Sequence, residues 1–140
     1  MKVWDASAVL PLLLGETGTP EVQSLYEKDS RIALWCLTEV EVGSALARRS
    51  REGRAPDDLE AARVEWRGLA DRSTEIWSVN LVRSRSLRLV NTHPLRAADA
   101  LQLAAAIVAS GERPEALPFV CLDDRLREAA RREGFPVLPA

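Results

Sequence analysis

Four carboxylates stand at positions in the sequence where an acidic side chain is unexpected. Asp5 and Asp123 each follow a short apolar segment. Glu41 lies between two valines, and Asp99 interrupts the most apolar stretch of the chain. Charges in apolar surroundings are costly, and gathered carboxylates repel one another unless a cation neutralises them. Mg²⁺ and Mn²⁺ prefer such oxygen ligands and promote attack of water on phosphodiesters, so the pattern favours metal-assisted hydrolysis.

Asp5 and Glu41 also have structural explanations. Asp5, together with Ser7, is suited to capping a helix that begins directly after it. Glu41 follows Thr38 by three residues, which is the spacing of a capping box. Asp99 is harder to explain as a cap, because apolar residues precede it. Each signal is weak alone, and the combination of four is what favours a functional site.

The fourth acid is one of two neighbours, Asp123 and Asp124. The spacing to Leu126, Ala129 and Ala130, the apolar face of the helix that follows, favours Asp123 as the residue directed toward the site. Asp124 is then an exposed acid in the first helical turn, where the helix dipole favours a negative charge. The alternative that Asp123 and Asp124 are both only first-turn acids of this helix, without a functional role, remains open.

The elements that must position these residues alternate between short apolar runs and longer helical stretches. That alternation is typical of βαβ units and predicts an α/β fold, with helices on both faces of a mostly parallel sheet in a single domain spanning residues 1–140. Ligands of such sheets bind beyond the carboxyl ends of the strands. The predicted strands are Lys2–Trp4, Arg31–Leu34, Glu75–Val79, Pro118–Leu122 and Pro136–Leu138. The predicted helices are Ser7–Leu14, Pro20–Lys28, Thr38–Arg51, Pro56–Ala70, Leu81–Val90, Leu95–Ser110 and Arg125–Glu133.

Composition excludes several classes of function. The formal net charge of the 140 residues is -2, so the molecule is not a cationic nucleic-acid clamp, and any nucleic acid must be held by a local patch or through metal ions. A single histidine, His93, excludes a poly-histidine metal site. Cys36 and Cys121 lack the spacing of a zinc site or a disulfide framework. The apolar run after Asp5 is too short for a signal peptide, and we expect a cytoplasmic protein without a membrane span.

At these acidic residues the sequence resembles the PIN-domain family, and within it the VapC-type toxins of bacterial toxin–antitoxin pairs. The matching stretches, in the family's order and across nearly the whole chain, are VWDASAVLPLLLGE, LTEVEVGSALAR, LRAADALQLAAA and FVCLDDRLREAARREGF. The resemblance implies a three-layer α/β/α sandwich and a ribonuclease that depends on Mg²⁺ or Mn²⁺. Its catalytic and metal-binding acids fall on Asp5, Glu41, Asp99 and Asp123, and Ser7 matches an accessory hydroxyl.

The resemblance also implies partners. Members of this kind are usually homodimers, and a small antitoxin inhibits them by inserting its C-terminal segment into the active-site groove. Two positions depart from the family pattern. Cys121 stands where Thr or Ser is common, and Gln102 stands where His is frequent; neither departure touches the four acids.

Some residues outside the acidic set are candidates for contacts with RNA or an antitoxin. Arg48 and Arg49 stand near the end of the helix that carries Glu41, where the alternative is simple complementation of the helix C-terminus. Trp66 has polar neighbours and is the candidate for a dimer or antitoxin contact. Of the other three tryptophans, Trp4 and Trp77 fall in predicted strands and Trp35 directly follows one, so we expect core packing for all three.

The sequence thus predicts an endoribonuclease that uses metal-activated water, and it leaves two alternatives open. One is a phosphohydrolase with Asp5 as nucleophile, which Ser7 disfavours because such sites usually carry a second Asp there. The other is a catalytically weak PIN-like interaction module, which Cys121 and Gln102 allow.

Overall fold

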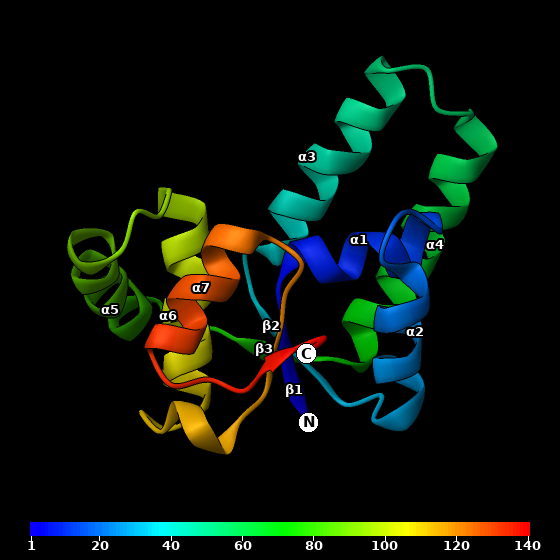
Figure 1. Ribbon diagram of the computed structural model, residues 1–140. Coiled ribbons are helices and arrows are strands. Elements are labelled where there is room, and N and C mark those ends of the chain that lie inside the picture. Colours follow the sequence, from blue (N-terminus) through cyan, green and yellow to red (C-terminus); the bar gives the residue numbers. More distant parts are fainter.

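The computed structural model describes residues 1–140 and contains a five-stranded sheet in the order β3-β2-β1-β4-β5 (Figure 1). All four neighbouring pairs are parallel. Because every pair is parallel, the carboxyl ends of all five strands lie at the same edge of the sheet. The strands are β1 (Lys2–Trp4), β2 (Ile32–Trp35), β3 (Thr74–Ile76), β4 (Phe119–Val120) and β5 (Val137–Leu138).

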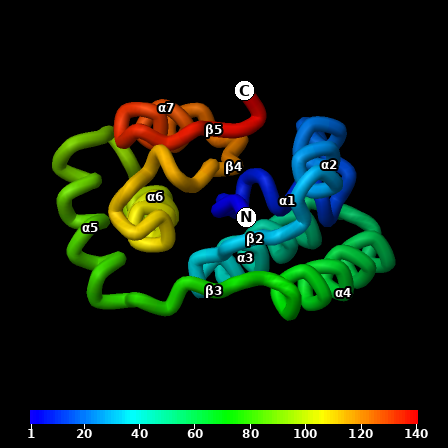
Figure 2. The backbone as a smooth tube through the Cα atoms, turned by 90° about the horizontal axis from the view of Figure 1, so that it is seen from below, coloured from blue at the N-terminus to red at the C-terminus, as the bar shows by residue number.

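Helices cover both faces of this sheet, as the sequence predicts (Figure 2). One core cluster joins the sheet to α5, α6 and α7, and the other joins it to α1, α2, α3 and α4. Val3 and Trp4 enter opposite clusters because successive side chains of a strand point to opposite faces. The helices are α1 (Ala6–Leu14), α2 (Thr19–Lys28), α3 (Thr38–Arg51), α4 (Pro56–Arg72), α5 (Val79–Thr92), α6 (Ala97–Ala109) and α7 (Asp124–Arg132), with a 3₁₀ turn at Pro114–Ala116.

Local sequence explains where several elements end. Helix α1 stops at Leu14 because Gly15 adopts a left-handed conformation, with φ of 63°. Pro56 occupies the first turn of α4, where a missing N–H is harmless. His93 follows α5 and is buried, with its Nε2 2.7 Å from Oε1 of Glu133, so the end of α5 is tied to the residue after α7.

Two predictions about tryptophans are wrong. Trp66 is 8% exposed and packs in the core, because the buried residues Leu59, Ala62, Trp66 and Leu69 of α4 share one helical face. It is therefore not a surface contact. Strand β3 ends at Ile76, one residue before Trp77, which is 67% exposed and takes no part in core packing. None of the helices combines the length and the apolarity needed to cross a membrane.

The two core clusters predict a sharp contrast between two leucine substitutions. Leu103 of α6 is fully buried against the sheet, so Leu103→Ala should lower the free energy of unfolding by about 2–5 kcal/mol, through lost apolar contact and a residual cavity. Leu87 of α5 is 61% exposed, and Leu87→Ala should change the free energy of unfolding by less than about 0.5 kcal/mol. Urea denaturation measures both, and equal effects would contradict the assignment of α6 to the core.

Candidate active site

Asp5 and Asp123 are held at the carboxyl ends of neighbouring strands. The backbone N–H of Asp5 donates to the carbonyl of Val120 at 2.9 Å, which fixes the end of β1 against β4. Oδ2 of Asp5 accepts from the backbone N–H of Ser7 at 3.0 Å and caps α1. Oδ1 of Asp123 accepts from the N–H of Leu126 at 2.9 Å and caps α7. Both acids are therefore helix caps, and the caps orient them at the sheet edge.

Glu41 and Asp99 lie in first helical turns without capping a helix. The capping box predicted for Thr38 and Glu41 is wrong. Thr38 is the first residue of α3, and the cap position is taken by Leu37, which forms no side-chain cap bond. The Thr38 hydroxyl is instead buried and accepts from Nε2 of Gln102 at 3.0 Å. Asp99 is the third residue of α6, which begins two residues later than predicted. Both carboxylates are thus free of bonds to their own helix ends.

All four acids line one cavity of about 570 Å³, together with Ser7. It lies where the N-terminal ends of α1, α3, α6 and α7 gather beyond the carboxyl edge of the sheet (Figure 1). Helix N-terminal ends carry partial positive charge and exposed N–H groups, which favour anions. The structure therefore brings together the residues that the sequence singled out: Asp5, Ser7, Glu41, Asp99 and Asp123.

Burial and mutual repulsion raise the pKa values of Asp5, Glu41 and Asp99. Burial raises the pKa of Asp5 above its ordinary value, and the charge of Asp123 adds to this against the hydrogen bonds from Ser7. Burial, followed by the charges of Asp5 and Asp99, raises the pKa of Glu41 to about 7. The pKa of Asp99 rises to about 6, again by burial first and then through Asp123 and Asp5. The acids therefore interact electrostatically across the cavity.

Ser7 and Cys121 support the buried carboxylate of Asp5. The Ser7 hydroxyl accepts from the N–H of Leu122 at 2.9 Å and lies 3.6 Å from Sγ of Cys121. That thiol also lies 3.7 Å from Oδ2 of Asp5. Burial raises the pKa of the Cys121 thiol, so it remains a neutral, weak donor to the carboxylate. It thus occupies a position where a hydroxyl would be a stronger donor.

The chemistry of this donor set fits a hard divalent cation, because it consists of carboxylates supplied by four separate elements. The side chains do not converge on a single point, however. Nowhere in the structure do three or more His, Cys, Asp or Glu side chains form a group that could hold a metal ion. A cation at this site would have to draw the carboxylates together.

The arginines near the site behave differently from one another. Arg48 lines the acidic cavity, whereas Arg49 points to a neighbouring one and pairs with Glu16 at 2.9 Å. Arg96, directly before α6, also lines the acidic cavity, and sequence reasoning missed it. Its only sequence signal is its place three residues before Asp99. An ordinary surface arginine could equally stand there, so the position alone does not indicate a function.

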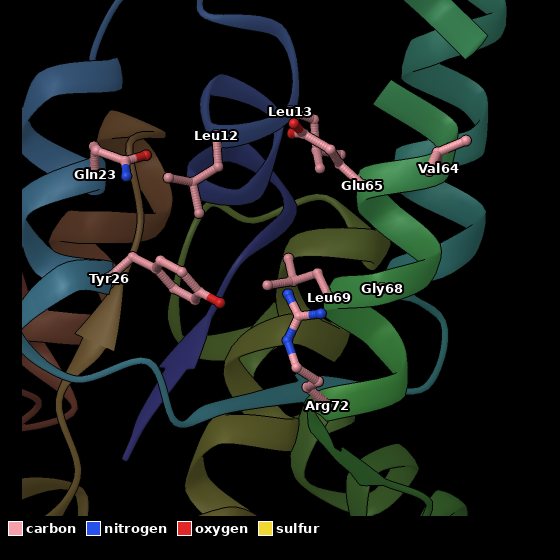
Figure 3. Close-up of a pocket in the computed structure, with 9 residues that line it drawn as sticks. All are labelled: Leu12, Leu13, Gln23, Tyr26, Val64, Glu65, Gly68, Leu69 and Arg72. Atoms are coloured by element: carbon pink, nitrogen blue, oxygen red, sulfur yellow. The ribbon is translucent and has the colours of Figure 1, made fainter. Parts of the chain in front are cut away.

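Other cavities lack this chemistry. A cavity of about 450 Å³ lies among α1, α2 and α4, with leucines and Tyr26 beside Glu65 and Arg72 (Figure 3). It contains none of the four acids. Asp124 lines a third cavity, of about 270 Å³, with His93 and Arg132. Asp123, and not Asp124, therefore lines the acidic cavity, as the sequence predicts.

The raised pKa values predict how the stability of the metal-free protein depends on pH. Because Asp5, Glu41 and Asp99 have higher pKa values folded than unfolded, the folded state binds more protons between about pH 4.5 and about pH 7. Stability contributed by protonation is present below this window and is lost as the pH rises through the folded pKa values. In EDTA, urea denaturation should give a lower free energy of unfolding at about pH 7.5 than at about pH 5.5.

Glu41→Gln provides the matched control for this pH dependence. The amide has the same shape but does not titrate, so the variant should lose less stability over the same pH range. Asp29 and Glu133, whose pKa values are lowered by hydrogen bonds from Arg31 and Arg88, act in the opposite sense at more acidic pH. Identical pH profiles for the variant and the parent protein would contradict the role given to Glu41.

Comparisons with known proteins place this chain and its fold in a family. Residues 2–132 match the family model of the PIN domain. Ribonucleases VapC45 and VapC49, from two strains of Mycobacterium tuberculosis, are each 29% identical to this chain over 138 residues, which cover 98% of this chain and 94% of theirs. The crystal structure of PAE2754 from Pyrobaculum aerophilum matches with a TM-score of 0.65 and 25% identity, over 91% of this chain and 84% of that one. Since the family model spans nearly the whole chain and the three-layer fold agrees with it, this protein belongs to the PIN-domain family.

Proposed function

We propose that this protein is an endoribonuclease that depends on Mg²⁺ or Mn²⁺ and cleaves RNA phosphodiester bonds with metal-activated water. One observation carries the proposal: carboxylates from four elements, distant in sequence, line a single cavity at the carboxyl edge of the sheet. The relatives named as ribonucleases support the same reading. When bound, the divalent cation supplies activation of water and neutralisation of phosphate charge.

The hydrogen bonds and pKa values of the acids suggest a separate role for each of them. Asp5 and Asp123, oriented by their helix caps, are proposed to bind the cation directly or through water, with Asp99 as the third ligand. Glu41, whose pKa is about 7, is suited to binding the cation or to positioning the attacking water and accepting its proton. Ser7 fixes the loop after β4 through Leu122 and so supports Asp5.

We further propose that the protein is the toxin of a cytoplasmic toxin–antitoxin pair, inhibited by a cognate antitoxin and active as a homodimer. The resemblance to VapC-type toxins and the names of the two mycobacterial relatives support this. Arg49, which is tied to Glu16, is better placed for an antitoxin contact than for the RNA that occupies the acidic cavity.

Asp5→Asn should abolish metal-dependent RNA cleavage and leave the fold intact. The amide oxygen still caps α1, but the ligand charge is lost. Mutation of a residue that only hydrogen-bonds to a metal ligand typically lowers metal affinity or activity about 10- to 100-fold, so loss of a ligand itself should lower cleavage by more than about 100-fold. Asp124→Asn is the matched control and should retain activity, because Asp124 faces a different cavity. Cleavage of labelled RNA in Mg²⁺ measures both, and full activity of Asp5→Asn would falsify the assignment.

Metal binding should be measurable without any substrate. Calorimetric titration with Mn²⁺ should show binding at millimolar or lower concentration, weakened in Asp99→Asn and unchanged in Asp124→Asn, because only the first variant alters the acidic cavity. The absence of binding at millimolar Mn²⁺ would favour the alternative of an interaction module that retains the fold without cleaving RNA.

A further inference from the structure

Three arginines around the acidic cavity have no ion-pair partner. Arg48 and Arg96 line the cavity, whereas Arg125, in the first turn of α7, lines the cavity that also contains His93 and Asp124. All three are exposed, and none lies within 4.0 Å of a carboxylate, although acids stand close by. Arg88 and Arg132 are paired with glutamates, whereas Arg113 is unpaired as well, so the three arginines are distinguished by their place near the acidic site. The guanidinium groups beside the cavity are therefore free to bind an anion from outside the chain.

Two of these arginines act electrostatically on Asp99. The charges of Arg96 and Arg125 both oppose the rise in the pKa of Asp99. Arg96 comes from the start of α6 and Arg125 from the start of α7, whereas Arg48 comes from α3, which stands across the sheet edge from those two helices (Figure 1). The cations thus surround the acidic cavity from both sides.

An acidic cavity on a protein of net charge -2 presents an electrostatic problem to a polyanion. A cation bound among the carboxylates would neutralise the phosphate at the centre, but the neighbouring phosphates of the same strand lie beyond it. Phosphate contacts from arginine fix the position of a nucleic acid without reading its sequence. Unpaired arginines at the rim are suited to this task.

We propose that Arg96 and Arg125 bind a backbone phosphate of single-stranded RNA on one side of the scissile bond, and that Arg48 binds one on the other side. The strand would then cross the acidic cavity from α6 and α7 toward α3. This inference rests on the proposed ribonuclease function and adds the path of the substrate and the residues that hold it. These arginines are positioning residues and do not take part in the chemical step.

The test measures RNA binding separately from cleavage. Fluorescence anisotropy of a labelled single-stranded RNA of mixed sequence is followed in Mg²⁺ at several salt concentrations, with Asp5→Asn as the parent protein. Each lost phosphate contact should reduce the slope of log affinity against log salt by about 0.7. That corresponds to about 8-fold weaker binding at about 0.05 M salt. We expect this reduction in Arg96→Ala, Arg125→Ala and Arg48→Ala.

Two further variants separate a phosphate contact from a structural role. Arg96→Lys keeps the charge and should keep most of the salt dependence, because lysine also binds phosphate. Arg113→Ala removes the same charge beyond the far end of α6, about 20 Å away along a helix of 13 residues, and should bind RNA as the parent does. Arg113 is exposed and unpaired, like the three rim residues.

The outcomes distinguish the inference from the function on which it rests. Unchanged slopes in the three rim variants would overturn the inference, even if Asp5→Asn has lost cleavage. An equal reduction in Arg113→Ala would also overturn it, because the effect would then reflect net charge alone. Persistent metal-dependent cleavage by Asp5→Asn would instead overturn the proposed function. Thermal unfolding of each variant, monitored by circular dichroism, verifies that the fold is retained.

Discussion

Repulsion among carboxylates at one edge of a parallel sheet is the constraint around which this structure is built. The parallel arrangement forces strand ends and helix starts to the same edge, and the acids at these points share one cavity. Burial first, and then the charges of neighbouring acids, raise the pKa of Glu41 to about 7 and that of Asp99 to about 6. Two apolar cores hold the edge rigid from both faces, so the helices cannot move apart to relieve the repulsion.

Specific contacts transmit the sheet geometry to the acids. The bond from Asp5 to the carbonyl of Val120 sets the end of β1 against β4. On the other side of the cavity, Gln102 donates to the buried hydroxyl of Thr38 and links α6 to α3, the helices that carry Asp99 and Glu41. The departure from the family's frequent histidine at position 102 therefore has a structural role here. Gln102 connects two elements that must keep a fixed separation.

The fold and the acidic set could be predicted from the sequence because both depend on local pattern. Apolar runs identified the strands within a few residues, and an acid after each of two runs marked the sheet edge. The prediction for Trp66 failed because its immediate neighbours are polar. Periodicity in α4, with Leu59, Ala62 and Leu69 on the same face, gives the correct answer. The prediction for Trp77 failed because the end of a strand depends on the strand with which it pairs. The neighbouring strand β2 ends at Trp35, opposite Ile76, so β3 ends before Trp77.

The arginines could not be ranked from sequence, since their roles depend on contacts between distant segments. Arg48 and Arg49 are adjacent in the chain, yet one lines the acidic cavity and the other pairs with Glu16. One residue of helical rotation, about 100°, separates the two positions. Nothing in the sequence indicates a role for Arg96, because its place in the acidic cavity depends on α6 beginning beside the sheet edge.

Helix capping and metal binding are compatible roles for the same aspartate. A cap uses one carboxylate oxygen as an acceptor, Oδ2 in Asp5 and Oδ1 in Asp123, and a carboxylate has about four lone-pair sites in all. The cap bond therefore fixes the side chain and leaves capacity for a second partner. A ligand oriented before the metal arrives loses less conformational freedom on binding. Asp5 and Asp123 meet that condition, whereas Glu41 and Asp99 make no cap bond that would orient their carboxylates in advance.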